Sequence, residues 1–174
     1  MKVRIRPALD VLSPDKPAVF IHVEGNSVRD SSGSSYNEEE VKVVKALVRG
    51  LLNCKVKANG IGIVTPYRAQ RSKILEEVKK LGIIPEVDTV DAFQGREKDV
   101  IIFSVTSTKS FRFAAEPHRL NVALTRPRCK LIVIGDGKAI YRKAKKTLLY
   151  NFLEFCYYKQ RIYNWKEKRW MTSK

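Results

Sequence analysis

Two polar segments in the middle of the chain each lie next to an apolar, β-branched run. Residues 88–99, DTVDAFQGREKD, precede the run VIIFSV at residues 100–105. Residues 119–126, RLNVALTR, precede the run LIVIGD at residues 131–136. Short, continuous apolar runs are typical of strands buried on both faces of a parallel sheet. Polar loops at the ends of such strands are where open α/β sheets bind ligands, so we expect a functional site here.

Arg126, which closes the second polar segment just before a strand, indicates one kind of chemistry. Phosphoryl transfer requires little covalent chemistry from a protein, but it requires positive groups around the transferred phosphate. A guanidinium suits that role because its planar fork can bind two phosphate oxygens. The alternative is an ordinary surface salt bridge.

The strings VDAFQGREKD and NVALTR resemble motifs V and VI of superfamily 1 helicases. The nearest pattern is that of the branch containing senataxin and the nonsense-mediated decay helicase. The resemblance implies that Arg126 is the motif VI arginine, which reaches across a cleft to the γ-phosphate of ATP. The family usually has alanine after this arginine, whereas Pro127 and then Arg128 follow here. Proline removes an N–H and fixes φ, so it can alter the loop that aims Arg126.

Residues 62–71, GIVTPYRAQR, resemble motif IV of the same helicases. The resemblance implies that Arg71 is a second γ-phosphate arginine, on the first turn of the following helix. It also implies that Thr65, Pro66 and Tyr67 lie near bound nucleic acid at the carboxyl end of a strand. This motif is less specific, and a strand-to-helix turn with ordinary surface charges is the alternative.

Within motif V the resemblance implies roles on both sides of the site. Glu97 matches the acidic residue at the nucleotide ribose, and Gln94 links the nucleotide to the nucleic acid. Thr89 and Asp91 match positions on the nucleic-acid side. Gly95 permits a close backbone approach to a ligand.

Asn37 and Glu40 have the Asn-x-x-Glu spacing and resemble motif IIIa, which lies between the nucleotide and the sheet. A helix cap and a first-turn acid explain the same two residues equally well.

The chain has no Gly-x-x-x-x-Gly-Lys-Ser/Thr phosphate loop and no Asp-Glu pair at the end of an apolar strand. In these helicases both features belong to the first RecA-like domain, and the ATP site lies between the two domains. The resemblance therefore implies the second RecA-like domain, over residues 18–158. ATP would be the cofactor, and the Mg²⁺ ligands would lie on the first domain. We expect the chain to be a piece of a longer helicase or a stand-alone relative of one, and inactive by itself.

The elements that must position these residues alternate along the chain. The patterning predicts a lead-in segment at 1–17 and a loop at 24–36, with these strands and helices: strands at 18–23, 60–65, 86–90, 100–105 and 131–136, and helices at 38–52 and 67–81. Alternation of this kind predicts an α/β fold, with a parallel sheet and helices on both faces. The predicted fold class is RecA-like, without the phosphate loop.

The composition narrows the class of partner. The 174 residues carry a net charge of +16, which favours nucleic acid over a membrane surface, with a solvated basic surface as the alternative. No apolar run is long enough to cross a bilayer. Cys54, Cys129 and Cys156 fit reduced thiols in a cytosolic or nuclear protein better than disulfides or zinc ligands.

The stretch at residues 138–174 has a different character. It holds eleven Lys or Arg against two acidic residues, so 11 − 2 = +9 of the total charge lies here. Basic residues interleaved with aromatics suit single-stranded nucleic acid. We expect a helix at 139–158 that docks on the sheet, then a less regular basic, aromatic tail at 159–174. For the tail, packing and nucleic-acid binding are equally expected.

Two functions fit these features. The first is the C-terminal motor domain of an ATP-dependent RNA or DNA helicase, whose partners are a single strand and the first RecA-like domain. The second is a non-catalytic nucleic-acid-binding or regulatory module with a RecA-like fold. A phosphate loop in frame upstream would favour the first, and a genuine start at Met1 would favour the second.

Overall fold

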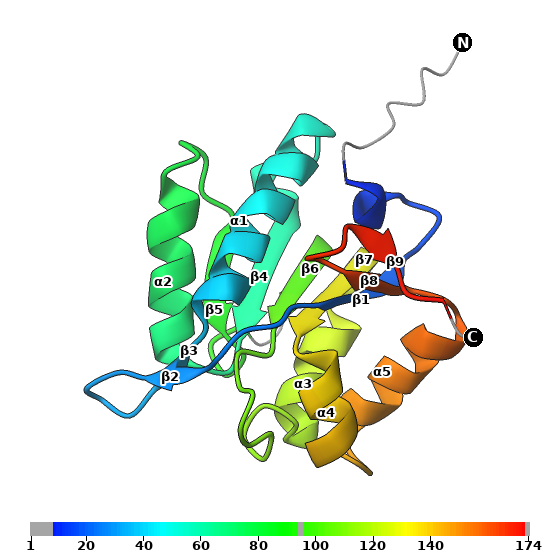
Figure 1. The fold of residues 1–174 in the computed structure, drawn as a ribbon. Helices are drawn as coiled ribbons and strands as arrows, with labels where there is room; N and C mark the ends of the chain where they lie inside the picture. Colours follow the sequence, from blue (N-terminus) through cyan, green and yellow to red (C-terminus); the bar gives the residue numbers. More distant parts are fainter. Residues whose placement is uncertain (1–8, 94–95, 173–174) are drawn as a thin grey trace.

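A seven-stranded sheet forms the centre of the computed structural model, which describes residues 9–93 and 96–172 (Figure 1). Its strands, in spatial order, are β5 (Glu86–Thr89), β4 (Ile61–Thr65), β6 (Lys98–Ser104), β7 (Pro127–Gly135), β1 (Ala18–His22), β8 (Ile162–Asn164) and β9 (Arg169–Trp170). All neighbours pair in parallel except β8 and β9, which are antiparallel. The predicted parallel α/β fold is confirmed.

Helices cover both faces of the sheet (Figure 1). One face carries α1 (Glu38–Asn53) and α2 (Arg68–Lys79), and the other carries α3 (Pro117–Thr125), α4 (Gly137–Lys143) and α5 (Leu148–Tyr158). Neighbouring residues of β6 point to opposite faces, since Ile102 belongs to the apolar cluster under α1 and Ile101 to the cluster under α3. Burying each such side chain stabilises the fold by about 1.5–3 kcal/mol, which is why this strand is a continuous apolar run.

Helix α1 begins and packs as its sequence predicts. The Asn37 side chain accepts a hydrogen bond from the Glu40 N–H at 3.3 Å and so caps the helix. Val41, Val44 and Val48 lie at helical spacing and are buried against the sheet.

The single helix predicted at 139–158 is wrong. The chain leaves helical geometry after Lys143 and begins a new helix at Leu148. Lys146 has φ +64°, a left-handed conformation that a continuous helix does not allow. The Thr147 hydroxyl then accepts from the Tyr150 N–H at 3.1 Å and caps α5.

The prediction of a less regular tail at 159–174 is also wrong, because the chain forms two strands there. Ile162–Asn164 extends the central sheet as β8, and β9 folds back on it. Tyr163 is buried, with its ring 5.3 Å from that of Trp170 and 6.4 Å from that of Trp165. These aromatic residues therefore pack the edge of the sheet.

Three segments that were not predicted to form helices or strands contain short elements. The loop at 24–36 includes the hairpin of β2 (Val28–Arg29) and β3 (Ser35–Tyr36). Its turn is closed by the Asp30 carboxylate, which accepts from the N–H groups of Ser32 and Ser34 at 2.9 and 3.0 Å. Two single turns complete the elements: η1 (Asp10–Leu12), in the lead-in segment, and η2 (Ala58–Gly60). No helix in the described ranges is both long and apolar enough to cross a membrane.

Candidate functional site

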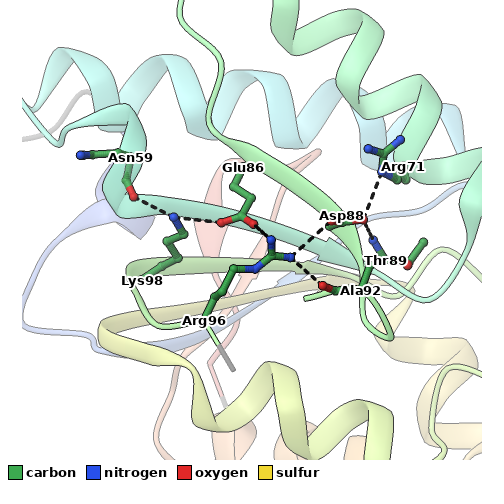
Figure 2. Close-up of polar contacts among 8 residues, drawn as sticks. All are labelled: Asn59, Arg71, Glu86, Asp88, Thr89, Ala92, Arg96 and Lys98. Carbon is green, nitrogen blue, oxygen red and sulfur yellow. Dashed lines mark hydrogen bonds and ion pairs between the residues drawn. The ribbon is translucent and has the colours of Figure 1, made fainter. Parts of the chain in front are cut away.

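Charged side chains form a ladder along the outer strand β5 (Figure 2). Arg71, on the first turn of α2, places its Nε 3.3 Å from a carboxylate oxygen of Asp88. The Arg96 guanidinium lies 3.3 Å from the other Asp88 oxygen and also pairs with Glu86. Glu86 in turn lies 2.9 Å from the Lys98 ammonium. The ladder therefore connects α2 with the start of β6.

Arg126 lies next to the far end of this ladder. It caps α3 at its C-terminus, and its carbonyl accepts from the Lys98 N–H at 3.1 Å. Pro127 stands opposite Lys98 and begins β7, a position where a strand tolerates the missing N–H. Pro127, which stands where the family usually has alanine, therefore fits the sheet.

Arg126 also differs from the arginines around it in its partners. Arg119 lies 3.3 Å from Asp91, and Arg128 lies 3.5 Å from Asp99. Arg126 forms no ion pair within residues 9–93 and 96–172, and its Nε, like those of Arg96 and Arg119, is buried with no hydrogen-bond partner there. A buried, unpaired donor on a cation is costly unless an anion meets it.

A buried polar network lies behind these residues, at the carboxyl ends of β4 and β6. Both carboxylate oxygens of Glu40 accept from the Thr106 N–H, at 2.9 and 3.1 Å, and one accepts from the Ser104 hydroxyl at 2.5 Å. The Gln70 amide donates to the Ser104 oxygen at 3.0 Å and accepts from the Asn37 N–H at 2.8 Å. The network thus joins α1, α2 and β6.

Two residues of the network have unusual properties: the pKa of Glu40 and the backbone conformation of Thr106. Burial raises the pKa of Glu40 to about 8, although the hydrogen bonds from Ser104 and Thr106 oppose that rise. Thr106 has φ +72°, a strained conformation for a β-branched residue, which the contacts of its N–H and hydroxyl hold in place.

Three predicted site residues are interior. The side chains of Asn37, Glu40 and Thr65 are fully or almost fully buried, and Thr65 lies 3.1 Å from the Thr106 hydroxyl. Asn37 caps α1 and Glu40 lies in its first turn, and both side chains also form hydrogen bonds with Thr106, after β6. In this conformation all three side chains contact Thr106 and lie away from the surface.

An open groove of about 1270 Å³ lies beyond the carboxyl ends of β4 and β5. The predicted residues Pro66, Tyr67, Thr89 and Asp91 all line it. Five cationic side chains line the groove against the single acid Asp91: Arg29, Arg68, Lys109, Arg112 and Arg119. Such a groove attracts a polyanion and releases its counterions.

An aromatic pair lies in this groove. The rings of Tyr67 and Phe113 are 5.2 Å apart, and the Arg119 guanidinium lies 4.1 Å from the Phe113 ring centroid. Phe113 is 41% exposed. Exposed aromatic faces beside cations suit the stacking of nucleic-acid bases.

The remaining motif V residues are less well placed. Glu97 is exposed and forms no ion pair in the described part of the chain. Gln94 and Gly95 lie outside the described residues. The structure thus brings Arg71 together with Thr89 and Asp91 near the end of β5, whereas Arg126 lies at the other end of the ladder, beside the start of β6.

Sequence reasoning missed several residues of the site. Gln70, Ser104 and Thr106 belong to the buried network, and Arg112 and Phe113 line the groove. The polar residues at the end of the run VIIFSVTST were a signal for the network. Phe113 lies in a loop and matched no motif.

No cluster of His, Cys, Asp or Glu able to hold a metal ion occurs among the residues with described positions. The acidic side chains of the ladder are paired with Arg and Lys instead.

A parallel α/β sheet with arginines along an outer strand and a basic groove at its carboxyl ends defines a RecA-like domain. The chain belongs to the AAA domain family, whose model matches residues 2–138, and is a superfamily 1 helicase domain of the nonsense-mediated decay and senataxin branch.

Named relatives agree with this family. The DNA polymerase alpha-associated DNA helicase A of Saccharomyces cerevisiae is 40% identical over 80% of this chain and 22% of its own length. The ATP-dependent helicase upf1 of Schizosaccharomyces pombe is 38% identical over 83% of this chain and 16% of its own length. An uncharacterized ATP-dependent helicase of Methanocaldococcus jannaschii is 40% identical over 78% and 20%. The chain spans between 16% and 22% of the length of these relatives.

Proposed function

We propose that this chain is the C-terminal motor domain of an ATP-dependent helicase that acts on RNA or DNA. The observation that carries the proposal is Arg126, a partly buried cation with no carboxylate partner in the described ranges, beside an edge where the neighbouring arginines are paired. The helicase names of the relatives support the same class. The three free cysteines fit work in the reducing cytoplasm or nucleus.

ATP with Mg²⁺ would be held mainly by a first RecA-like domain in the same protein, and would supply the phosphoryl group. This chain would contribute two arginine side chains to the ATP site. Arg126 would meet the γ-phosphate with its unpaired guanidinium. Arg71 would do so with its two terminal nitrogens, because its Nε faces Asp88. Glu97 would face the ribose, with Gln94 and Gly95 beside the nucleotide.

The groove would hold the single strand. Pro66, Tyr67, Thr89 and Asp91 would line its path, with Phe113 stacking on a base. The buried network would couple the two sites, because Gln70 precedes Arg71 on α2 while Thr106 precedes the groove residue Ser107. A displacement of α2 would therefore displace residues of the groove.

The missing phosphate loop gives the test of this proposal. We expect the chain alone to show no ATP turnover above background, with or without a single strand. Joined to the first RecA-like domain of a relative, it should show strand-stimulated turnover, measured as phosphate release. A joined protein that binds strands but never hydrolyses ATP would favour the non-catalytic binding module. Robust turnover by the chain alone would contradict the proposal.

Phe113→Ala tests the groove. Base stacking on an aromatic contributes about 1–3 kcal/mol, so we expect roughly a 5- to 150-fold loss of affinity for oligouridylate. Fluorescence anisotropy measures the change. Phe155→Ala is the matched control, since Phe155 is 43% exposed but lies on α5, outside the groove. Equal affinities of the two variants would show that Phe113 does not contribute to strand binding.

A further inference from the structure

The basic groove continues past the loop that precedes α3. A second hollow, of about 430 Å³, shares Lys109, Ser110 and Arg112 with the groove. Its far wall is formed by Lys143 and Thr147, on either side of the turn between α4 and α5. In Figure 1 the β2–β3 hairpin, the loop before α3 and this turn lie along the same side of the molecule. The two hollows therefore make one path across the carboxyl-end face of the sheet.

Hydrogen bonds at Thr108 hold the parts of this path together. The Ser27 N–H donates to the Thr108 hydroxyl at 3.2 Å, and the Thr108 N–H donates to the Ser27 hydroxyl at 3.1 Å. The Lys143 ammonium donates to the Thr108 carbonyl at 3.2 Å. One residue thus connects the segment before the hairpin, the groove loop and the end of α4.

The turn between α4 and α5 presents unbalanced positive charge. Lys145 and Lys146 are both exposed and form no ion pair with any residue of the described chain. The capped N-terminus of the eleven-residue helix α5 follows directly and adds a partial positive charge. Among the described residues that line the second hollow, Glu116 is the only acid, and it caps α3 through the His118 and Arg119 N–H groups.

Aromatic side chains lie beside these lysines. The Lys145 ammonium is 5.8 Å from the centroid of the Tyr141 ring, which stacks on Tyr150 at 5.7 Å. Tyr141 is 55% exposed. Cations next to an exposed aromatic stack are the features that bind single-stranded nucleic acid without sequence preference.

We propose that a single strand leaving the groove continues across the second hollow to the turn between α4 and α5, just beyond its far wall, where its phosphates contact Lys145 and Lys146. This inference rests on the proposed strand-binding function of the groove. The groove lies beyond β4 and β5, whereas α4 follows β7, two strand spacings or roughly 10 Å from β4. At about 3.4 Å per nucleotide a three-nucleotide strand spans roughly 10 Å, so it can lie in the groove without reaching the turn, while a longer one reaches both.

The test compares two double variants that remove the same charge. Lys145→Gln with Lys146→Asn alters the turn, and asparagine tolerates the left-handed backbone at 146. Lys55→Asn with Lys57→Gln is the matched control, because both lysines are exposed and Lys55 is also left-handed, with φ +66°. The control pair lies before β4, at the amino ends of the strands.

We expect a fifteen-nucleotide oligouridylate to bind the turn variant roughly 10-fold or more weakly than wild type at low salt. The slope of log affinity against log salt should fall by about 1.4, since each lost single-strand phosphate contact removes about 0.7. The control variant should match wild type. A three-nucleotide oligouridylate should bind all three proteins alike. If the double turn variant has a lowered melting temperature, Lys145→Gln alone replaces it, because Lys145 has an ordinary backbone conformation. The expected change in the slope is then half as large.

The outcomes separate this inference from the function on which it rests. Equal binding of the long probe by wild type and the turn variant overturns the inference and leaves the groove intact. An equal loss in both double variants also overturns it, because net charge alone would then explain binding. Failure of wild type to bind either probe would instead reject the strand-binding function itself.

Discussion

Arg126→Ala should lower strand-stimulated ATP turnover roughly 10³- to 10⁵-fold in a motor that joins this chain to a first RecA-like domain. That loss corresponds to about 4–7 kcal/mol of transition-state stabilisation. The reason is that the Arg126 guanidinium has no carboxylate partner among the described residues and is available to a developing phosphate charge. Steady-state phosphate release at saturating strand measures the change.

The fold should survive this substitution. The contact that Arg126 makes with the sheet runs through its carbonyl, which accepts from the Lys98 N–H, and alanine keeps that bond. The melting temperature and the strand affinity without nucleotide should therefore stay close to those of the parent. Arg126→Lys should restore little activity, because an ammonium keeps the charge but not the planar fork.

Arg128→Ala is the matched control for Arg126→Ala. Arg128 lies two residues further on, is more exposed and pairs with Asp99 at 3.5 Å, so its loss should leave turnover nearly unchanged. If Arg128→Ala abolished turnover while Arg126→Ala did not, Arg128 would be the phosphate ligand. A collapse of the Arg126→Ala melting transition would make that residue structural.

The main strands could be predicted because their signal is local. Each of β4, β6, β7 and β1 contains a run of consecutive apolar residues, and strands covered on both faces require that pattern. Strand β8 has only three residues, too few to show a period, and its place beside β1 is set by tertiary pairing. The break between α4 and α5 depends on one left-handed lysine, a type that gives no warning in sequence.

The surface part of the site could be predicted better than the interior part. Motif strings located Tyr67, Thr89 and Asp91, which line the groove. They could not show that Thr65 and Glu40 are buried, because polar residue types give no sign of the partners that make their burial possible. Those partners, Ser104 and Thr106 among them, come from the end of β6 and the segment after it, more than sixty residues away from Glu40.

Removal of the Glu40 side chain is the second change for which we expect a large effect, because buried groups donate hydrogen bonds to it. Glu40→Ala leaves the buried Ser104 hydroxyl and Thr106 N–H without an acceptor, and each unsatisfied group costs about 1–3 kcal/mol. For a domain of this size we expect a fall in melting temperature of roughly 5–20 °C. Because the strained Thr106 precedes the groove residue Ser107, strand affinity should fall as well.

Glu40→Gln separates the hydrogen bonds of this side chain from its charge. Burial raises the pKa of Glu40 to about 8 from an ordinary 4.5, so folding takes up a proton between these two values. The wild-type free energy of unfolding should therefore fall as pH rises from 4.5 to 8, by up to about 1.4 kcal/mol per pH unit from this group. Glutamine has no proton to lose, so Glu40→Gln should become progressively more stable relative to wild type over that range.

Urea unfolding of both proteins at pH 5, 6, 7 and 8 measures that difference directly. Glu39→Gln is the matched control, since Glu39 is the preceding residue of α1 and is exposed, with its carboxylate 2.7 Å from the Lys42 ammonium. Its pH profile should run parallel to that of wild type. If the Glu40→Gln profile ran parallel too, Glu40 would be ionised in the folded state. The three hydrogen bonds from Ser104 and Thr106 would then outweigh its burial, and the network would hold a buried negative charge near the charged ladder along β5.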